Sequence, residues 1–137
     1  MSVDSQTELE RTAAFRTELR RFLRRTSAVT TDAGLTPERY DLLLMVYASP
    51  GHRSSVTQLC DALQLRQTAV TELVKRAVEA GLVKRRQSPD DARVSLIELT
   101  ADGERRMHAV FDALRDDRDA FAEALQLLRR RFLATAK

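Results

Sequence analysis

The 137-residue sequence contains few residues that favour turns or can cross-link a chain: four glycines, three prolines and one cysteine. So few turn-forming residues leave little room for a fold of many short strands. The lone Cys60 excludes an intramolecular disulfide and offers no metal-binding cluster. With 43% hydrophobic and 31% charged residues, we expect one mostly α-helical domain over residues 1–137 with a single core.

Two kinds of apolar segment are also missing. The N-terminus has no basic stretch followed by an apolar one, so no secretory signal is expected. The longest unbroken apolar run, Leu42–Ala48, is far too short to span a membrane. The sequence therefore predicts a cytoplasmic protein without a membrane partner.

The formal net charge is only +3, but the charge is unevenly distributed. Residues 66–93 contain seven Lys and Arg against four acidic residues, and residues 102–123 contain seven acidic residues against four basic ones. A basic middle indicates a face that meets a polyanion, although an ordinary solvated surface can show the same pattern.

Apolar periodicity predicts a helix over residues 7–30 and a second helix that begins at Thr36-Pro37, where Thr36 caps. Ser55 and Gln58 have the spacing of a capping box for a short helix. After a tight turn, a further helix over residues 67–80 places Val70, Leu73, Val74 and Ala77 inward and ends at Gly81.

The apolar period then changes. Segments 82–85 and 94–99 are short and β-prone, and they flank a polar stretch with turn residues, which predicts a hairpin with a basic tip. Thr100 caps a final helical region with an apolar heptad seam: Met107, Phe111, Leu114, Phe121, Leu125, Leu128 and Phe132. The charged segment Arg115–Asp119 leaves open whether this last helix is continuous or broken.

Two short helices joined by a tight turn and followed by a hairpin are typical of a winged helix-turn-helix domain. From Leu35 to Met107 the sequence resembles the MarR family (multiple-antibiotic-resistance regulators). The resemblance is carried by Gly34–Pro37, by Thr71–Arg76 and by Asp91-Ala92-Arg93 placed six residues before Leu99–Gly103. At Ala77 the family usually has a large aliphatic residue, so packing beneath that helix is expected to differ slightly.

The resemblance implies a winged helix-turn-helix over residues 35–100, flanked by dimerisation helices at 1–34 and 101–137. It further implies a homodimeric, sequence-specific DNA-binding transcription regulator, a repressor on a pseudo-palindromic operator, with no cofactor and no metal. The DNA-binding candidates on the recognition helix are Arg66, Gln67, Thr68, Thr71, Glu72 and Lys75, and those on the hairpin are Lys84, Arg85, Arg86, Asp91 and Arg93.

The chemistry of these side chains fits that role. Gln67 can pair with an adenine edge, and threonines suit phosphate or a thymine methyl group. Glu72 either accepts from a cytosine amino group or restrains a neighbouring arginine. Lys84, Arg85 and Arg86 suit the DNA backbone, whereas Arg93 would enter the minor groove with Asp91 holding it.

Other functions remain possible from the sequence. A winged helix can serve protein contacts alone. An enzyme is disfavoured because His52 and His108 lie far apart in sequence and in unlike settings, with no nucleophile assigned to either. Cys60 stands at an apolar position, where a buried structural side chain is expected rather than a redox sensor. A small anionic aromatic effector could bind near Tyr40, Tyr47 and an arginine such as Arg16 or Arg20, although a core role also suits both tyrosines.

Overall fold

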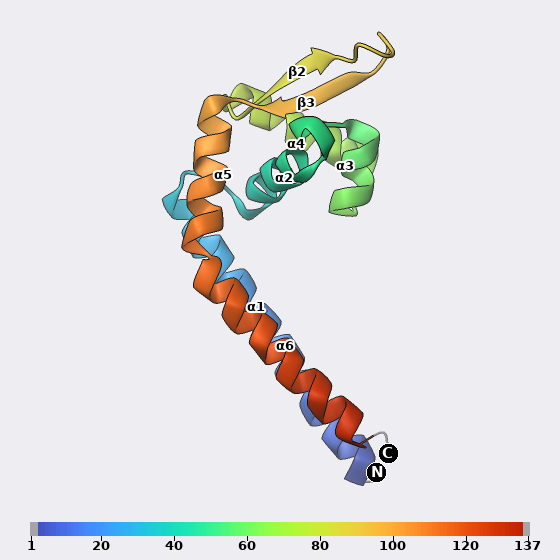
Figure 1. The fold of residues 1–137 in the computed structure, drawn as a ribbon, viewed down its shortest axis with the longest axis vertical. Coiled ribbons are helices and arrows are strands. Elements are labelled where there is room, and N and C mark those ends of the chain that lie inside the picture. Colours follow the sequence, from blue (N-terminus) through green and yellow to red (C-terminus); the bar gives the residue numbers. More distant parts are fainter. Residues whose placement is uncertain (1–2, 136–137) are drawn as a thin grey trace. The chain divides into compact units, whose positions relative to one another are not determined.

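The computed structural model describes residues 3–135, with side chains described for residues 4–129. Its elements are α1 (Val3–Asp32), α2 (Pro37–Ala48), a 3-10 turn (Pro50–His52), β1 (Arg53–Ser55), α3 (Val56–Leu63), α4 (Gln67–Glu79), β2 (Val83–Gln87), β3 (Ser95–Leu99), α5 (Ala101–Ala113) and α6 (Arg115–Thr135) (Figure 1). The expected mostly helical fold with a small β-wing is confirmed.

The chain divides into two compact units. The winged-helix unit comprises Thr30–Phe111, and the paired-helix unit comprises the residues up to Val29 together with those from Asp112 onward. The chain thus passes between the units twice, at 29–30 and at 111–112.

In the winged-helix unit, α2, α3 and α4 pack on one another and against a three-stranded antiparallel sheet of order β1-β3-β2. Leu42, Leu43, Leu59 and Ile97 are completely buried and form the centre of the core. Tyr40 is also buried, at 5% exposure, which agrees with a core role for this tyrosine.

The predicted helix starts are confirmed atom by atom. Thr36 accepts a hydrogen bond from the Arg39 N–H (3.2 Å), and Pro37 occupies the first turn of α2. Ser55 accepts from the Gln58 N–H (3.2 Å) while the Gln58 side chain accepts from the Ser55 N–H (3.0 Å), which completes the capping box of α3.

The end of α4 is a Schellman motif. Gly81 has a φ of +74°, in the left-handed region that favours glycine. The Gly81 N–H donates to the Val78 carbonyl (3.0 Å) and the Leu82 N–H to the Ala77 carbonyl (2.9 Å). This turn directs the chain from α4 straight into β2.

Strand β1 was not expected from the sequence. It is only three residues long and pairs with β3, with Arg53 opposite Glu98. Strands of this length are too short for an alternating pattern to reveal them. In the hairpin, β2 extends to Gln87, two residues beyond the predicted end of that strand.

In the paired-helix unit, α1 and α6 lie side by side (Figure 1). Phe22 of α1 stacks on Phe121 of α6 with ring centroids 5.1 Å apart. Nε of Arg25 lies 3.2 Å from Oδ1 of Asp117, which adds an ion pair between the same two helices.

The final helical region is broken at Leu114, immediately before the charged segment Arg115–Asp119. The break divides the predicted heptad seam. Met107 and Leu114 are 2% exposed and Leu128 is 7% exposed, whereas Phe111 is 37% exposed. Part of the seam is therefore covered within the chain, and the Phe132 side chain lies outside the described side chains.

Candidate nucleic-acid interface

Helix α4 presents one apolar face to the core and one polar face to solvent. Val70, Val74 and Ala77 are completely buried, and Leu73 is half-buried, which confirms the predicted stripe. The six predicted site residues of this helix are all exposed: Arg66, Gln67, Thr68, Thr71, Glu72 and Lys75. Thirteen residues at about 1.5 Å each make a rod about 20 Å long, which suits the major groove.

The turn before α4 is held by local hydrogen bonds. Gln64 ends α3 with a φ of +56°, and its side-chain amide donates to the Asp61 carbonyl (2.6 Å). The Leu65 N–H donates to the Cys60 carbonyl (3.2 Å). Because Arg66 caps α4 without a side-chain hydrogen bond to the helix, its guanidinium is not occupied by capping.

Glu72 pairs with Arg76, whose Nε donates to Oε1 at 3.0 Å across one helical turn. This contact agrees with restraint of a neighbouring arginine, one of the two roles considered for Glu72. Arg76 was absent from the predicted site. The i, i+4 spacing of opposite charges could have identified it.

The loop between β2 and β3 projects away from the helices of the winged-helix unit (Figure 1). The Ser88 N–H donates to the Val94 carbonyl (2.9 Å), and the Gln87 side chain donates to the Ala92 carbonyl (2.9 Å). The Val94 N–H in turn donates to the Asp91 carbonyl (3.0 Å). These bonds give the tip of the hairpin a defined conformation.

Asp91 and Arg93 are brought together at this tip. One carboxylate oxygen of Asp91 accepts from the Arg93 backbone N–H (3.0 Å) and from Nε (3.2 Å), and the other accepts from Nη2 (3.3 Å). The side-chain hydrogen bond from Arg93, followed by the backbone one, lowers the pKa of Asp91 below its usual value. The Arg93 side chain is 91% exposed, so the carboxylate fixes its direction while leaving it accessible.

The basic residues of β2 lie on an exposed edge strand. Lys84, Arg85 and Arg86 are all exposed, and side chains alternate between the two faces. Glu98 of β3 lies between Arg53 and Lys84 in the register, and Nε of Arg86 is 3.7 Å from its carboxylate. One acidic side chain thus lies among three basic ones on a single face of the sheet.

The two histidines, which are far apart in sequence, meet at one ring. His52 stacks on Tyr47 with centroids 4.1 Å apart, and His108 contacts the same ring edge-on at 5.0 Å. Nδ1 of His52 lies 2.6 Å from the Tyr47 carbonyl oxygen, and His108 lies 3.8 Å from Glu104. His52 lies in a loop turn and His108 on a charged helix, as expected, but their contact with the same ring was not expected, and Tyr47 has a packing role.

Cys60 is half-buried rather than fully buried as expected. Within residues 3–135, no group of three or more His, Cys, Asp or Glu side chains could hold a metal ion. None of the helices in that range combines the length and hydrophobicity needed to cross a membrane.

A hollow of about 360 Å³ lies along α1 and is lined by Thr17, Arg20, Arg21 and Arg24. Arg20, a residue of the proposed effector site, thus lines this hollow. Arg21 is engaged by Glu18 at 2.6 Å. The surface of this hollow is basic.

A tight helix pair with an exposed second helix, followed by a hairpin with an ordered basic tip, defines a winged helix-turn-helix protein. Residues 33–94 match the model of the MarR family. The fold matches a MarR family transcriptional regulator from Streptomyces coelicolor with a TM-score of 0.69 and 25% identity over 98% of this chain and 97% of that one. Over residues 33–94 the chain is therefore similar to the MarR family, and its fold is similar to that of MarR family regulators.

Two further relatives extend the comparison. The chain is 30% identical over 74 residues to the HTH-type transcriptional repressor YetL of Bacillus subtilis, and this match covers 54% of the chain and 44% of the relative. The match therefore spans less than half the length of this curated relative. A variant of E. coli MarR complexed with operator DNA shares the fold with a TM-score of 0.72 and 17% identity over the whole of both chains.

Proposed function

We propose that this protein is a sequence-specific, DNA-binding transcription regulator that acts from the cytoplasm. The observation that carries the proposal is the ordered Asp91–Arg93 pair on a projecting hairpin, combined with the exposed polar face of α4 in the same unit. A MarR relative of the same fold is seen with operator DNA, which supports the same function here.

Helix α4 would read the major groove. Gln67 and Thr68 lie in its first turn, where side chains of a recognition helix contact base edges. Lys75, farther along the exposed face, suits a phosphate. The Glu72–Arg76 ion pair carries no net charge, so binding by this part of the helix would depend less on phosphate attraction and more on base contacts.

The hairpin would add a second, independent contact. Arg93 is extended into solvent and held from behind by a carboxylate, a geometry that suits insertion into a narrow minor groove. Lys84 and Arg85 provide charge at the base of the hairpin. Because phosphates are the same in every sequence, these two residues would position the protein without specifying a site.

A homodimer is part of the proposal, since one winged helix reads only half of a palindromic site. Large apolar side chains of the paired-helix unit are exposed: Leu9 (53%), Phe15 (40%), Leu23 (54%) and Leu127 (57%). Exposed apolar side chains concentrated on two long helices favour burial against a second copy of the chain. Sedimentation velocity should give a dimer, and Leu23→Glu should shift it toward monomer.

Repression relieved by a small anionic aromatic effector completes the proposal. The basic hollow on α1 supports an anion site, with Arg20 as the residue that this hollow shares with the predicted set. Salicylate and benzoate should raise the Tm of the protein and lower its DNA affinity. Absence of both effects across a panel of aromatic acids contradicts this part of the proposal.

DNA binding itself is tested with duplexes selected by the purified protein from a random-sequence pool. In electrophoretic mobility shift, affinity should fall steeply as salt rises, because phosphate contacts release counterions. Arg93→Ala should weaken binding by about 10-fold or more, since a well-placed specific contact is worth roughly 1–3 kcal/mol. The folded state should not change, because the side chain contacts only its own loop.

Arg105→Gln is the matched control, since it also removes one exposed positive charge but lies on α5, outside α4 and the hairpin. Equal loss of affinity in both variants would show that Arg93 acts on DNA only through its general positive charge. Recovery of no selected duplex by the wild-type protein would favour the alternative, a winged helix used for protein contacts alone.

A further inference from the structure

The chain enters the winged-helix unit near Thr30 and leaves it at Phe111. The entering segment is the end of α1 and the turn at Ala33-Gly34, and the leaving segment is α5. One side chain of the leaving segment bonds to two residues of the entering segment that lie 73 and 72 positions earlier in the sequence. That side chain is Arg106.

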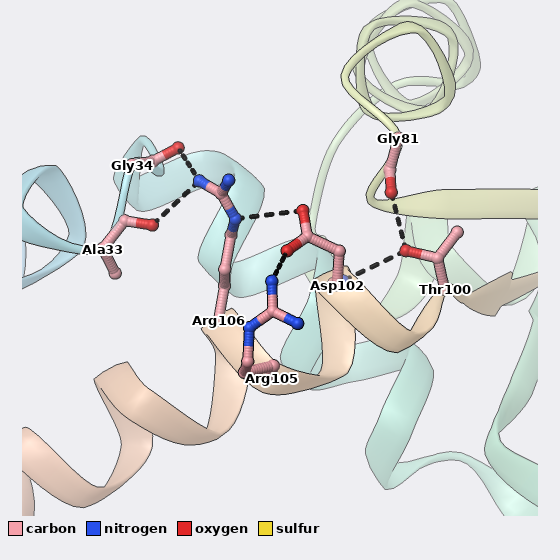
Figure 2. A network of polar contacts seen from close by, with 8 residues as sticks. Ala33, Gly34, Gly81, Thr100, Asp102, Arg105 and Arg106 are labelled. Atoms are coloured by element: carbon pink, nitrogen blue, oxygen red, sulfur yellow. Dashed lines mark hydrogen bonds and ion pairs between the residues drawn. The ribbon is translucent and has the colours of Figure 1, made fainter.

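Arg106 projects from α5 to the turn after α1, as Figure 2 shows. Its Nη1 donates to the carbonyl oxygens of Ala33 (3.1 Å) and Gly34 (3.4 Å). Its Nε donates to Oδ2 of Asp102 at 3.1 Å, one turn earlier on α5. The guanidinium is thus fixed at both ends, by a carboxylate on its own helix and by two carbonyls of the entering segment.

The guanidinium lies close against Gly34, whose backbone conformation itself favours glycine. Gly34 has a φ of +73°, and a Cβ atom there would overlap Nη1 of Arg106 and lie 3.5 Å from its guanidinium carbon. Carbonyls at the end of a helix carry partial negative charge and lack intrahelical partners, so a guanidinium is a suitable ligand for them. The contact is therefore specific in geometry and in charge.

The same turns of α5 hold the end of α4. The Thr100 hydroxyl donates to the Gly81 carbonyl (2.6 Å) and accepts from the Gly103 N–H (3.0 Å), and the Thr100 N–H donates to the Leu82 carbonyl (3.0 Å). Figure 2 shows the Thr100 side-chain bonds and those of Arg106 together on the first turns of α5. The end of α4 and the turn after α1 are thus both hydrogen-bonded to the first turns of α5 and its capping residue.

We propose that Arg106 is a positioning residue that sets the half-site spacing of the DNA this protein accepts. In a dimer, the distance between the two recognition helices depends on how each winged-helix unit is joined to the rest of its chain. Arg106 ties together the two segments that make this junction, so that they hold one arrangement instead of varying independently. The inference rests on the proposed DNA-binding function.

The geometry also separates this role from DNA contact. Arg106 is engaged by three oxygen acceptors on the protein, and its partners belong to α5 and to the turn after α1 rather than to α4 or the hairpin. Removal of the side chain should therefore leave base readout intact within each half-site. What changes is the range of separations at which both half-sites can be bound together.

The experiment measures the affinity of the wild type, Arg106→Gln and Arg105→Gln for one selected duplex and for versions with one or two base pairs added or removed between the half-sites. Arg105 is the matched control: it is adjacent, exposed and also paired with Asp102, but this ion pair stays within α5. The wild type and Arg105→Gln should bind one spacing best. Arg106→Gln should lose about fivefold or more of that preference, the lower range of coupling between sites.

Retention of the wild-type spacing profile by Arg106→Gln overturns the proposal. Loss of cooperative unfolding in Arg106→Gln also overturns it, because Arg106 would then stabilise the fold rather than select a spacing. An equal loss of preference in Arg105→Gln has the same consequence, since the Asp102 ion pair alone would explain it. Failure of the wild type to select any two-part site is distinct: it contradicts the proposed function itself.

Discussion

Gly103→Ala tests the packing that joins α5 to the end of α4. Helix propensity alone predicts that this change raises the free energy of unfolding by up to about 1 kcal/mol, because alanine is the better helix former. Here a Cβ atom would lie 2.9 Å from the Leu82 carbonyl carbon and nearer still to its oxygen. The obstacle is backbone rather than a flexible side chain, so α5 or the start of β2 has to move.

The cost can be estimated from the interactions that such a shift disturbs. Overpacking in a well-packed core costs about 1–3 kcal/mol, and the Thr100 bonds to Gly81 and Leu82 contribute about 0.5–1.5 kcal/mol each. After the gain in helix propensity, a net loss of about 2 kcal/mol is expected. For a chain of this size that is a fall in Tm of roughly 6–10 °C.

The assay is thermal and urea unfolding followed by circular dichroism at one fixed protein concentration, since dimerisation makes Tm depend on concentration. Gly81→Ala is the comparison, because a Cβ there meets nothing within 4 Å and only the positive φ is strained. Its cost should be about 1–2 kcal/mol, and Gly81→Asn should recover part of it. A Gly103→Ala protein as stable as the wild type would refute the argument from the Leu82 backbone.

Three further predictions concern DNA binding. Lys84→Ala with Arg85→Ala should lower affinity about equally across sequences and flatten the slope of log affinity against log salt by about 0.9 for each phosphate that is no longer neutralised; an unchanged slope in mobility shift contradicts their role. Asp91→Asn should weaken binding by the same factor at pH 6 and pH 8, because Arg93 lowers the pKa of Asp91 and the carboxylate is ionised throughout that range. The stabilisation that the Asp91–Arg93 pair provides is complete above the ordinary carboxyl pKa of about 4, and it is lost only as the pH falls through the lowered pKa in the folded protein. A loss of DNA affinity that differs between pH 6 and pH 8 is therefore inconsistent with the pair. Glu72→Gln should release Arg76 and raise affinity for unrelated DNA more than for the selected duplex; equal affinity for unrelated DNA before and after the change would show that the ion pair has no such effect.

Much of the fold could be predicted because its signals are local. A cap such as Thr36, a capping box such as Ser55 with Gln58, and a terminal glycine such as Gly81 each act within a few residues. The same holds for Asp91 and Arg93, since their pairing spans only two residues. Local chemistry of this kind can be read directly from the order of the side chains.

The features that were missed depend on contacts between distant segments. Arg106 bonds to carbonyls more than 70 residues away. Because every residue has a backbone carbonyl, the sequence does not indicate which ones are bound. His52 and His108 meet only because each packs on Tyr47. Strand β1 forms by pairing with β3, which is distant in the sequence. Tertiary structure creates these pairings, so the pattern of residues alone could not predict them.

The central claim is that α4 occupies the major groove while Arg93 enters the minor groove. It is tested most directly by footprinting a selected duplex with the wild type and with Arg93→Ala. Methylation of guanine N7 reports the major groove, and hydroxyl-radical cleavage reports the minor groove. We predict two regions of major-groove protection, separated by about one helical turn or a multiple of it, that persist in Arg93→Ala while the flanking minor-groove protection disappears. Minor-groove protection that survives Arg93→Ala, or a duplex bound without major-groove protection, would contradict the claim.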